Sequence, residues 1–349
     1  MPKIIKSKNI VLAAMSTLAG ALPTAASAES IVVGSYGGSW GAAIKECVAD
    51  PFTKETGISV SLEPNVSSVT LAKLRQQKDA PVFAATWLDG GVSELAQDVV
   101  ENIDPAKIGG IGKILPKAIY RRADGSIYAI GTGYFSTGIA YNTSVIKTPP
   151  TSWWDLWKPE YAKQVIMPSP ATSVGVPLIV HLATLLGGSA ANVQPALAKL
   201  KELQVSSYFD ASGMASNSYM TEESVIGAYY HATTWDLIDK GLPLAFVVPK
   251  EGAVGNDIRI HLVKGNKSPD AAIKFVAKAV SKEASECFAK KLSLGPARTD
   301  AVLDDKVKAR LPWGKDGSAD NLAVVNWNEV NPHRDEIIDQ FNRTLGAKH

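Results

Sequence analysis

Short apolar segments alternate with amphipathic ones along most of this 349-residue chain. The apolar run at 31–33 precedes residues 42–53, whose apolar side chains recur at helical spacing. The alternation then repeats, with strand-like segments at 58–62 and 81–91 and a helix-like segment at 69–78. Strands that alternate with helices of this length predict an α/β fold with parallel sheets.

The N-terminus has the features of a secretory signal peptide. Three lysines precede an apolar stretch, Ile10–Leu22, which is too short to span a bilayer, and Ala26-Ser27-Ala28 fits an A-x-A cleavage site. A membrane anchor is the alternative, but no stop-transfer run comes after it. We therefore predict that residues 1–28 are a signal peptide and that the protein is exported, to the periplasm if the host has an outer membrane.

Removal of this peptide changes the charge of the chain. The full sequence has 36 basic and 34 acidic residues, and loss of the three lysines leaves 33 against 34, a net charge near −1. No basic run or basic face predicts nucleic-acid binding. The 321 remaining residues (349 minus 28) and an apolar content of 46% predict a well-buried core in two domains.

The chain has two cysteines, Cys47 and Cys287. In an exported protein they can form one disulfide, or they can be two buried thiols, and the sequence alone leaves both possibilities open. Their wide separation matches no metal-binding motif.

The first loop, Gly37-Gly38-Ser39-Trp40-Gly41, fits the G-x-S-x-G pattern of hydrolases, with Ser39 as the nucleophile. That pattern requires several strands and an oxyanion loop earlier in the chain, whereas Ser39 follows the first strand of the mature protein. No histidine is marked as its base. We expect instead that Gly38 and its neighbours expose backbone amides to a ligand, flanked by Tyr36 and Trp40.

The segment AYYHATTW, residues 228–235, allows two interpretations. Tyr229 and Tyr230 are a pair like the phenolate ligands of exported ferric-iron-binding proteins, with His231 and Asp89 as further ligands. However, successive strand residues point to opposite faces. A tyrosine and His231 lining an organic pocket is the interpretation that we prefer. We expect the protein to bind no cofactor.

Asp257 and Arg259 lie two residues apart on a predicted strand, so they share a face. They can receive the ammonium and carboxylate of a ligand, or they can form a salt bridge with each other or with the opposite lobe. The sequence does not separate these possibilities.

Several segments together resemble the extracellular solute-binding proteins of ABC importers, in the spermidine/putrescine-binding and γ-aminobutyrate-type group. They include SYGGSW, PFTKETGISV, STGIAYN, PPTSWWDLWKPEY, PLAFVVPKEGAV and VNWNEVNPHRDEIIDQFNR. The resemblance implies a type II periplasmic-binding-protein fold: residues 29–138 plus 253–300 as lobe 1, 139–252 as lobe 2, and 301–349 packing across both. It implies hinge strands near 138–142 and 247–252, and a monomer that performs no chemistry and docks on a membrane permease.

The resemblance also implies which residues contact the ligand: Tyr36, Ser39, Trp40, Asp89, Gly90, Tyr134, Phe135, Ser169, Thr172, Tyr229, Tyr230 and His231. Polyamine-binding members place carboxylates in the loop that matches PSPATS and in the strand after PKEGAV. Here the loop has Ser169 and Thr172, and Ile258 takes the strand position, with Asp257 shifted by one. Because a buried ammonium needs an acidic partner, these departures favour a singly cationic or zwitterionic metabolite over spermidine.

Overall fold

The computed structural model describes residues 1–2 and 29–346, so the predicted signal peptide lies almost entirely outside the described residues. The described chain is a mixed α/β structure in which the main path of strands runs β2-β1-β3-β10-β5-β8-β6-β7. Among these residues, no helix combines the length and the apolar character that are needed to cross a bilayer.

The first part of the chain forms a set of parallel strands. The strand β1 (Ser30–Ser35) lies between β2 (Ser59–Pro64) and β3 (Phe83–Asp89), parallel to both. The helices that alternate with them are α1 (Gly38–Ile44), α2 (Asp50–Thr56), α3 (Ser67–Gln76) and α4 (Gly90–Leu95). A π-helical turn, Lys45–Ala49, joins α1 to α2. The predicted alternation is confirmed here.

The middle of the chain forms a second parallel set. The strand β6 (Val165–Pro168) pairs in parallel with β7 (Val205–Phe209) and β8 (Ile226–Tyr230). The accompanying helices are α5 (Gly175–Leu185), α6 (Gln194–Glu202), α7 (Ser212–Met220) and α8 (His231–Asp239).

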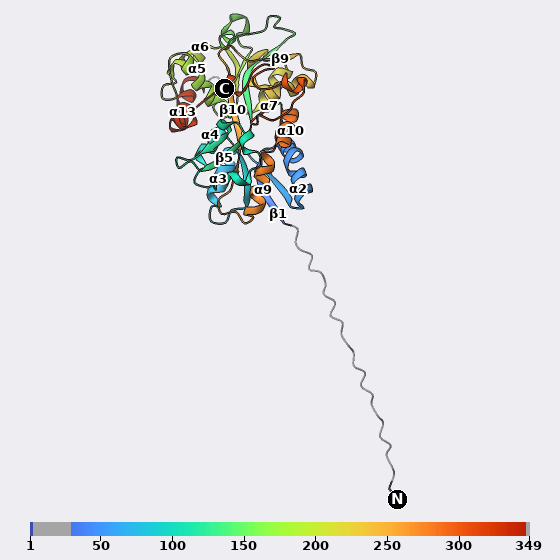
Figure 1. Cartoon of the computed structure of the whole chain (residues 1–349). Coiled ribbons are helices and arrows are strands. Elements are labelled where there is room, and N and C mark those ends of the chain that lie inside the picture. Colours follow the sequence, from blue (N-terminus) through green and yellow to red (C-terminus); the bar gives the residue numbers. More distant parts are fainter. Residues whose placement is uncertain (3–28, 347–349) are drawn as a thin grey trace.

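Two long strands join the two sets. In β5 (Ile127–Asn142) the first part pairs with β10 (Ala253–Leu262), and residues 137–141 pair with β8. Shorter strands β4 (Ile119–Arg121) and β9 (Leu244–Val247) also pair with β5. Figure 1 shows β5 and β10 in the middle of the molecule, between the half with β1, α3 and α9 and the half with α5, α6 and β9.

All these pairings of β5, and that of β10 with β3, are antiparallel. The prediction of parallel sheets is therefore wrong for the centre of the molecule. Hydrophobic periodicity identifies a strand, but it does not specify the direction of the neighbouring strand.

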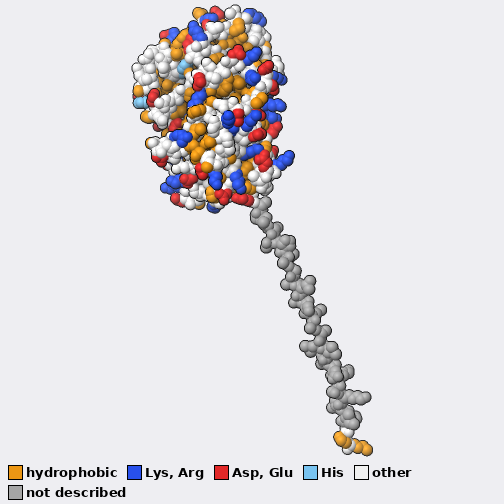
Figure 2. Space-filling model, in the orientation of Figure 1, with side chains coloured by type: hydrophobic (Ala, Val, Ile, Leu, Met, Phe, Trp, Pro, Cys, Tyr) orange, Lys and Arg blue, Asp and Glu red, His pale blue; other side chains and the backbone are white. Residues whose placement is uncertain are grey.

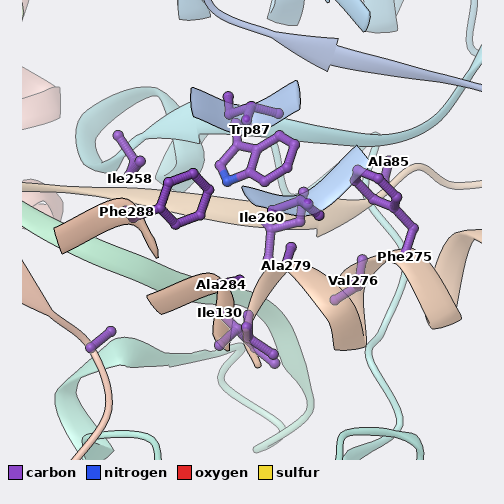
Figure 3. Close-up of a cluster of buried hydrophobic side chains, with 14 of the residues drawn as sticks. Ala85, Trp87, Ile130, Ile258, Ile260, Phe275, Val276, Ala279, Ala284 and Phe288 are labelled. Carbon is purple, nitrogen blue, oxygen red and sulfur yellow. The ribbon is translucent and has the colours of Figure 1, made fainter. Parts of the chain in front are cut away.

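The half that contains β1 has its own hydrophobic core. Side chains from β3 and β10 meet helices α9 (Pro269–Ala279) and α10 (Lys282–Leu292) there. Trp87 packs edge-to-face on Phe275 with ring centroids 5.8 Å apart, and Figure 3 shows Ile258, Ile260 and Phe288 around them. The other half is built around a separate cluster that includes Trp153 and Phe341, the latter from α13 (Arg334–Leu345).

Cys47 and Cys287 form a disulfide, with their Cα atoms 5.6 Å apart. This settles the question that the sequence left open. The bond fastens the turn between α1 and α2 to α10, which lies 240 residues later in the chain. Basic and acidic side chains are interspersed over the face of the molecule in Figure 2.

Candidate functional site

Both sets of parallel strands end at one cavity of about 360 Å³. Tyr36 follows β1 and Asp89 ends β3, whereas Ser173, Ser212 and Tyr230 follow or end β6, β7 and β8. Parallel strands bring their carboxyl ends to one edge of a sheet, where α/β proteins bind ligands. The cavity therefore lies where the topology favours a ligand site.

A continuous row of aromatic rings forms one wall of this cavity. Tyr36 contacts Trp40 with ring centroids 5.9 Å apart, Trp40 contacts Phe135 at 6.1 Å, and Phe135 contacts Tyr230 at 6.3 Å. The row runs from the loop after β1, through β5, to the end of β8. Such ring faces attract cationic groups.

Asp89 is a half-buried carboxylate in the cavity. Its Oδ1 accepts a hydrogen bond from the phenol of Tyr36 at 3.0 Å, and its backbone N–H donates to Oγ of Ser67 at 3.0 Å. Burial raises the pKa of Asp89, and the negative charge of Asp257 raises it further, whereas the hydrogen bonds from Tyr36 and Ser67 lower it.

The charges that line the cavity have one sign. Of the described lining residues, Asp89 and Asp236 are acidic, and none is lysine or arginine. The residue Asp236 is exposed overall, but partial desolvation of its carboxyl group raises its pKa, and the charge of Lys240 opposes this shift. Hydroxyl groups of Ser39, Ser173, Ser212 and Thr233 add further hydrogen-bonding capacity.

The glycine loop adopts the conformation that its sequence suggests. Gly38 has a φ of +60°, a conformation that other L-residues rarely adopt, and α1 starts there. The N–H of Gly41 donates to the carbonyl of Gly37 at 3.2 Å, and the N-cap has no side-chain partner. A helix begins with backbone N–H groups that have no partner inside the helix.

The YYH segment divides between different environments. Tyr230 lines the cavity, and its hydroxyl is 3.2 Å from Oγ of Ser173. Tyr229 is fully buried, and its hydroxyl donates to the carbonyl of Ser212 at 2.7 Å. His231 bounds the cavity, but its imidazole is fully buried and bonded to the backbone of Ser136 and Ser293. Burial lowers the pKa of His231 to about 4.

Asp257 and Arg259 pair with each other and do not line this cavity. Nε of Arg259 donates to Oδ2 of Asp257 at 2.7 Å, and Nη1 donates to Oε1 of Glu94 at 2.7 Å. The guanidinium also stacks on the ring of Tyr120 at 3.3 Å, and the Tyr120 hydroxyl donates to Asp257 at 2.6 Å. Of the two possibilities left open by the sequence, the structure contains the ion pair.

Four other predicted ligand residues also lie outside the cavity lining. Oγ of Ser169 donates to Asp210, and Oγ1 of Thr172 donates to the Ser169 carbonyl at 2.8 Å. Tyr134 is buried and packs on Trp313. A Cβ at Gly90 would come within 2.8 Å of side-chain atoms of its neighbours, so this turn is packed on the protein.

Sequence reasoning missed seven lining residues: Gly37, Ser173, Ser212, Ala232, Thr233, Asp236 and Ile258. Ser212 begins α7 three residues after β7 ends, and this position between a strand and a helix could have been recognised in the sequence. Asp236 lies in the second turn of α8, and it reaches the cavity only because this helix begins there.

Among residues 29–346, no hydrogen bond joins Ser39 to a histidine, and the hydroxyls of Tyr229 and Tyr230 do not converge as a pair of iron ligands. His261, like His231, is fully buried, and it bonds Oγ of Ser93 at 2.8 Å. Tyr229 and Tyr230 direct their hydroxyls to different neighbours, and burial raises the pKa of both, to about 12 for Tyr230. Both phenols are therefore protonated at neutral pH.

A model of the family described as bacterial extracellular solute-binding protein matches residues 48–312. The chain is 28% identical to a spermidine/putrescine-binding periplasmic protein of Haemophilus influenzae, over 88% of this chain and 87% of that protein. It is 23% identical to a gamma-aminobutyric acid-binding protein of Pseudomonas aeruginosa, over 93% of each chain.

Solved structures show the same fold. An ABC transporter protein from Clostridium perfringens superposes with a TM-score of 0.75 at 25% identity, covering 90% of this chain and 99% of that one. A GABA receptor superposes with the same TM-score at 21% identity, covering 90% of this chain and 96% of that one.

Proposed function

This chain belongs to the bacterial extracellular solute-binding proteins, and on that basis we propose that it captures a small amine-containing metabolite in the cavity beside Asp89. The family is a non-enzymatic part of ABC transporters, so its members deliver a solute to a membrane permease. A catalytic Ser39 is not consistent with this non-enzymatic role.

The observation that carries the proposal is the half-buried carboxylate of Asp89 in a cavity whose described lining contains no lysine or arginine. A ligand ammonium would place a positive group in direct contact with this carboxylate, and charge-assisted hydrogen bonds of this kind contribute roughly 1.5–3 kcal/mol. The faces of Trp40 and Tyr230 add about 0.5–2 kcal/mol to the binding of a cation.

The arrangement favours one ammonium centre in the interior. Asp236, the other carboxylate, is exposed, so an ion pair with it would be weakened by solvent. The N-terminus of α8 and the serine and threonine hydroxyls are available for a polar or anionic group at the other end of the ligand. A singly cationic or zwitterionic metabolite satisfies both ends of this cavity.

The names of the relatives support an amine as the ligand of this chain, but they do not identify which amine. One is named for spermidine and putrescine and another for gamma-aminobutyric acid, and both names describe compounds with amino groups. Their identities to this chain, 28% and 23%, leave room for a different ligand.

We further propose that the two halves are lobes that close over the ligand. In this proposal lobe 1 comprises residues 29–138 plus 253–300 and lobe 2 comprises 139–252, with residues 301–349 packing across both. The change of partner along β5 and the site residues contributed by both parallel sets support it. The hinges would lie near 138–142 and 247–252, and closure would bury the ligand in a monomeric receptor.

The experiment is a thermal-shift screen of the mature protein, residues 29–349, with matched pairs of compounds. Each amine is compared with the isostere in which a hydroxyl replaces the ammonium, for example γ-aminobutyrate with γ-hydroxybutyrate and putrescine with 1,4-butanediol. A bound ligand raises Tm by mass action. We expect shifts only with amines. A shift with the hydroxyl compounds and none with amines would contradict the proposal.

A further inference from the structure

The turn that carries Asp89 is packed from outside the cavity by the C-terminal segment. A Cβ at Gly91 would lie 2.7 Å from the Cε3 and Cζ3 atoms of Trp327, so the indole is in direct contact with the backbone there. Trp327 begins the short helix α12 (Trp327–Val330) and is 4% exposed. Only glycine leaves room for this contact.

A hydrogen bond fixes the same turn. Nδ2 of Asn331 donates to the carbonyl of Gly91 at 2.9 Å. Gly91 lies in the first turn of α4, two residues after Asp89. The first turn of α4 is therefore held by an aromatic ring and by a hydrogen bond, both from a segment about 240 residues later in the chain.

The contacting segment is itself anchored in the other half of the molecule. Shortly after Asn331 the chain enters α13, whose Phe341 packs edge-to-face on Tyr208 of β7, with ring centroids 5.0 Å apart. Ile337 and Leu345 are buried in the same cluster. The C-terminal segment thus connects the second core to the turn at the end of β3.

We propose that Trp327 and Asn331 are positioning residues for Asp89: they hold the Gly90–Gly91 turn so that the carboxylate meets the ligand ammonium at a fixed place. Neither residue lines the cavity, so neither contacts the ligand. This inference rests on the proposed function, because it concerns the carboxylate that the proposal assigns to the ligand.

The six-membered ring of Trp327 contacts Gly91, and its Nε1 atom approaches Gly90. Among the described residues, Nε1 of Trp327 has no hydrogen-bond partner. A phenylalanine keeps an aromatic ring at this position but lacks Nε1 and the outer ring atoms that reach Gly91, so Trp327→Phe is the conservative variant and should have a partial effect. Trp313→Ala is the matched control, because Trp313 also belongs to the C-terminal region but packs on Gly295 instead.

The first measurement needs no ligand. Hydrogen exchange of the α4 amides, residues 90–95, is compared in the mature wild type, Trp327→Ala, Trp327→Phe and Trp313→Ala proteins. We expect exchange to become about tenfold faster or more in Trp327→Ala, to become faster by a smaller factor in Trp327→Phe, and to stay near wild type in Trp313→Ala, because local opening costs less without the packed ring. Unchanged exchange in Trp327→Ala would overturn the inference.

The second measurement is a double-mutant cycle on affinity, made by calorimetry with γ-aminobutyrate and, in parallel, putrescine. We expect Trp327→Ala to weaken binding about tenfold in the wild-type background but less than about twofold in Asp89→Asn, because the position of the carboxylate no longer matters there. Equal losses in both backgrounds would show a general structural role and overturn the inference.

The outcomes separate the two proposals. If Asp89→Asn binds both amines as tightly as the wild type, the proposed site is wrong, whatever Trp327 does. If Asp89→Asn loses binding and the cycle shows no coupling, the site stands and the positioning role is wrong. An Asn331→Ala variant provides a second test of the role, since it removes the hydrogen bond to Gly91 and leaves the indole in place.

Discussion

The hydroxyl of Tyr36 donates a hydrogen bond to Oδ1 of Asp89 across 3.0 Å. The bond joins the loop after β1 to the end of β3, and both residues line the cavity. It holds the carboxylate of Asp89 in one orientation. Under the proposed function, we therefore expect the affinity for an amine to depend on Tyr36, which also contributes to the aromatic wall.

Replacement of Tyr36 by phenylalanine removes this hydrogen bond and keeps the ring. Loss of one hydrogen bond to a charged group costs about 1–2 kcal/mol, so we expect affinity for an amine to fall about 5- to 30-fold. Titration calorimetry measures the effect. Tyr141→Phe, on β5 and away from the cavity lining, is the control that should bind as the wild type does. Unchanged binding by Tyr36→Phe would argue against a ligand at Asp89.

Affinity for an amine should fall at acidic pH. The pKa of Asp89 is raised by burial, so the carboxylate takes up a proton at a higher pH than an exposed aspartate does. A neutral carboxyl group no longer attracts an ammonium, and binding weakens as the pH falls through this raised pKa. Calorimetry across a pH series measures it. A pH dependence that persists unchanged in Asp89→Asn would assign the effect to another group.

Two buried histidines predict acid sensitivity of the fold itself. Burial lowers the pKa of His231 to about 4 and that of His261 to about 3, below the value near 6.5 in the unfolded chain. The unfolded chain therefore takes up protons first, and stability falls as the pH drops below about 6.5. Each histidine contributes at most about 1.4 kcal/mol per pH unit, down to its folded pKa.

Denaturant unfolding between pH 7 and pH 4 tests this prediction. His231→Gln and His261→Gln, which cannot take up the proton, should each flatten the decline in the free energy of unfolding. An equally steep decline in both variants would show that carboxylates alone account for it.

Loss of the Cys47–Cys287 disulfide should destabilise the fold without changing the site. The bond closes a long loop, and removing such a bond costs about 2–5 kcal/mol. We expect the double variant Cys47→Ser/Cys287→Ser to unfold several degrees lower in calorimetry. Its affinity for an amine should stay near that of the wild type, since neither cysteine lines the cavity. A stable variant that has lost binding would contradict this account.

The sequence was a good guide to residues that line the cavity when they lie at or just after the end of a strand. Tyr36, Trp40 and Asp89 have such positions next to recognisable strands, and the structure brings these three together at one cavity. Tyr229 and Tyr230 alternate on their strand, and so only one of the pair reaches the cavity, as the period of a strand requires.

Other features depend on contacts between distant parts of the chain. Whether Asp257 pairs with Arg259 or faces a ligand is decided by Glu94 and Tyr120, which come from other elements. The contact of Trp327 with Gly91 joins residues that no local pattern relates. The antiparallel pairing of β5 with β10 is likewise a property of the assembled sheet.

Calorimetric titration of the wild type and of Asp89→Asn with γ-aminobutyrate, putrescine and their hydroxyl isosteres tests the central claim most directly. We predict that the wild type binds at least one of the amines, that the isosteres do not bind, and that Asp89→Asn weakens amine binding at least tenfold. Binding of the isosteres alone, or amine binding unaffected by Asp89→Asn, would contradict the claim that this receptor recognises an ammonium group at Asp89.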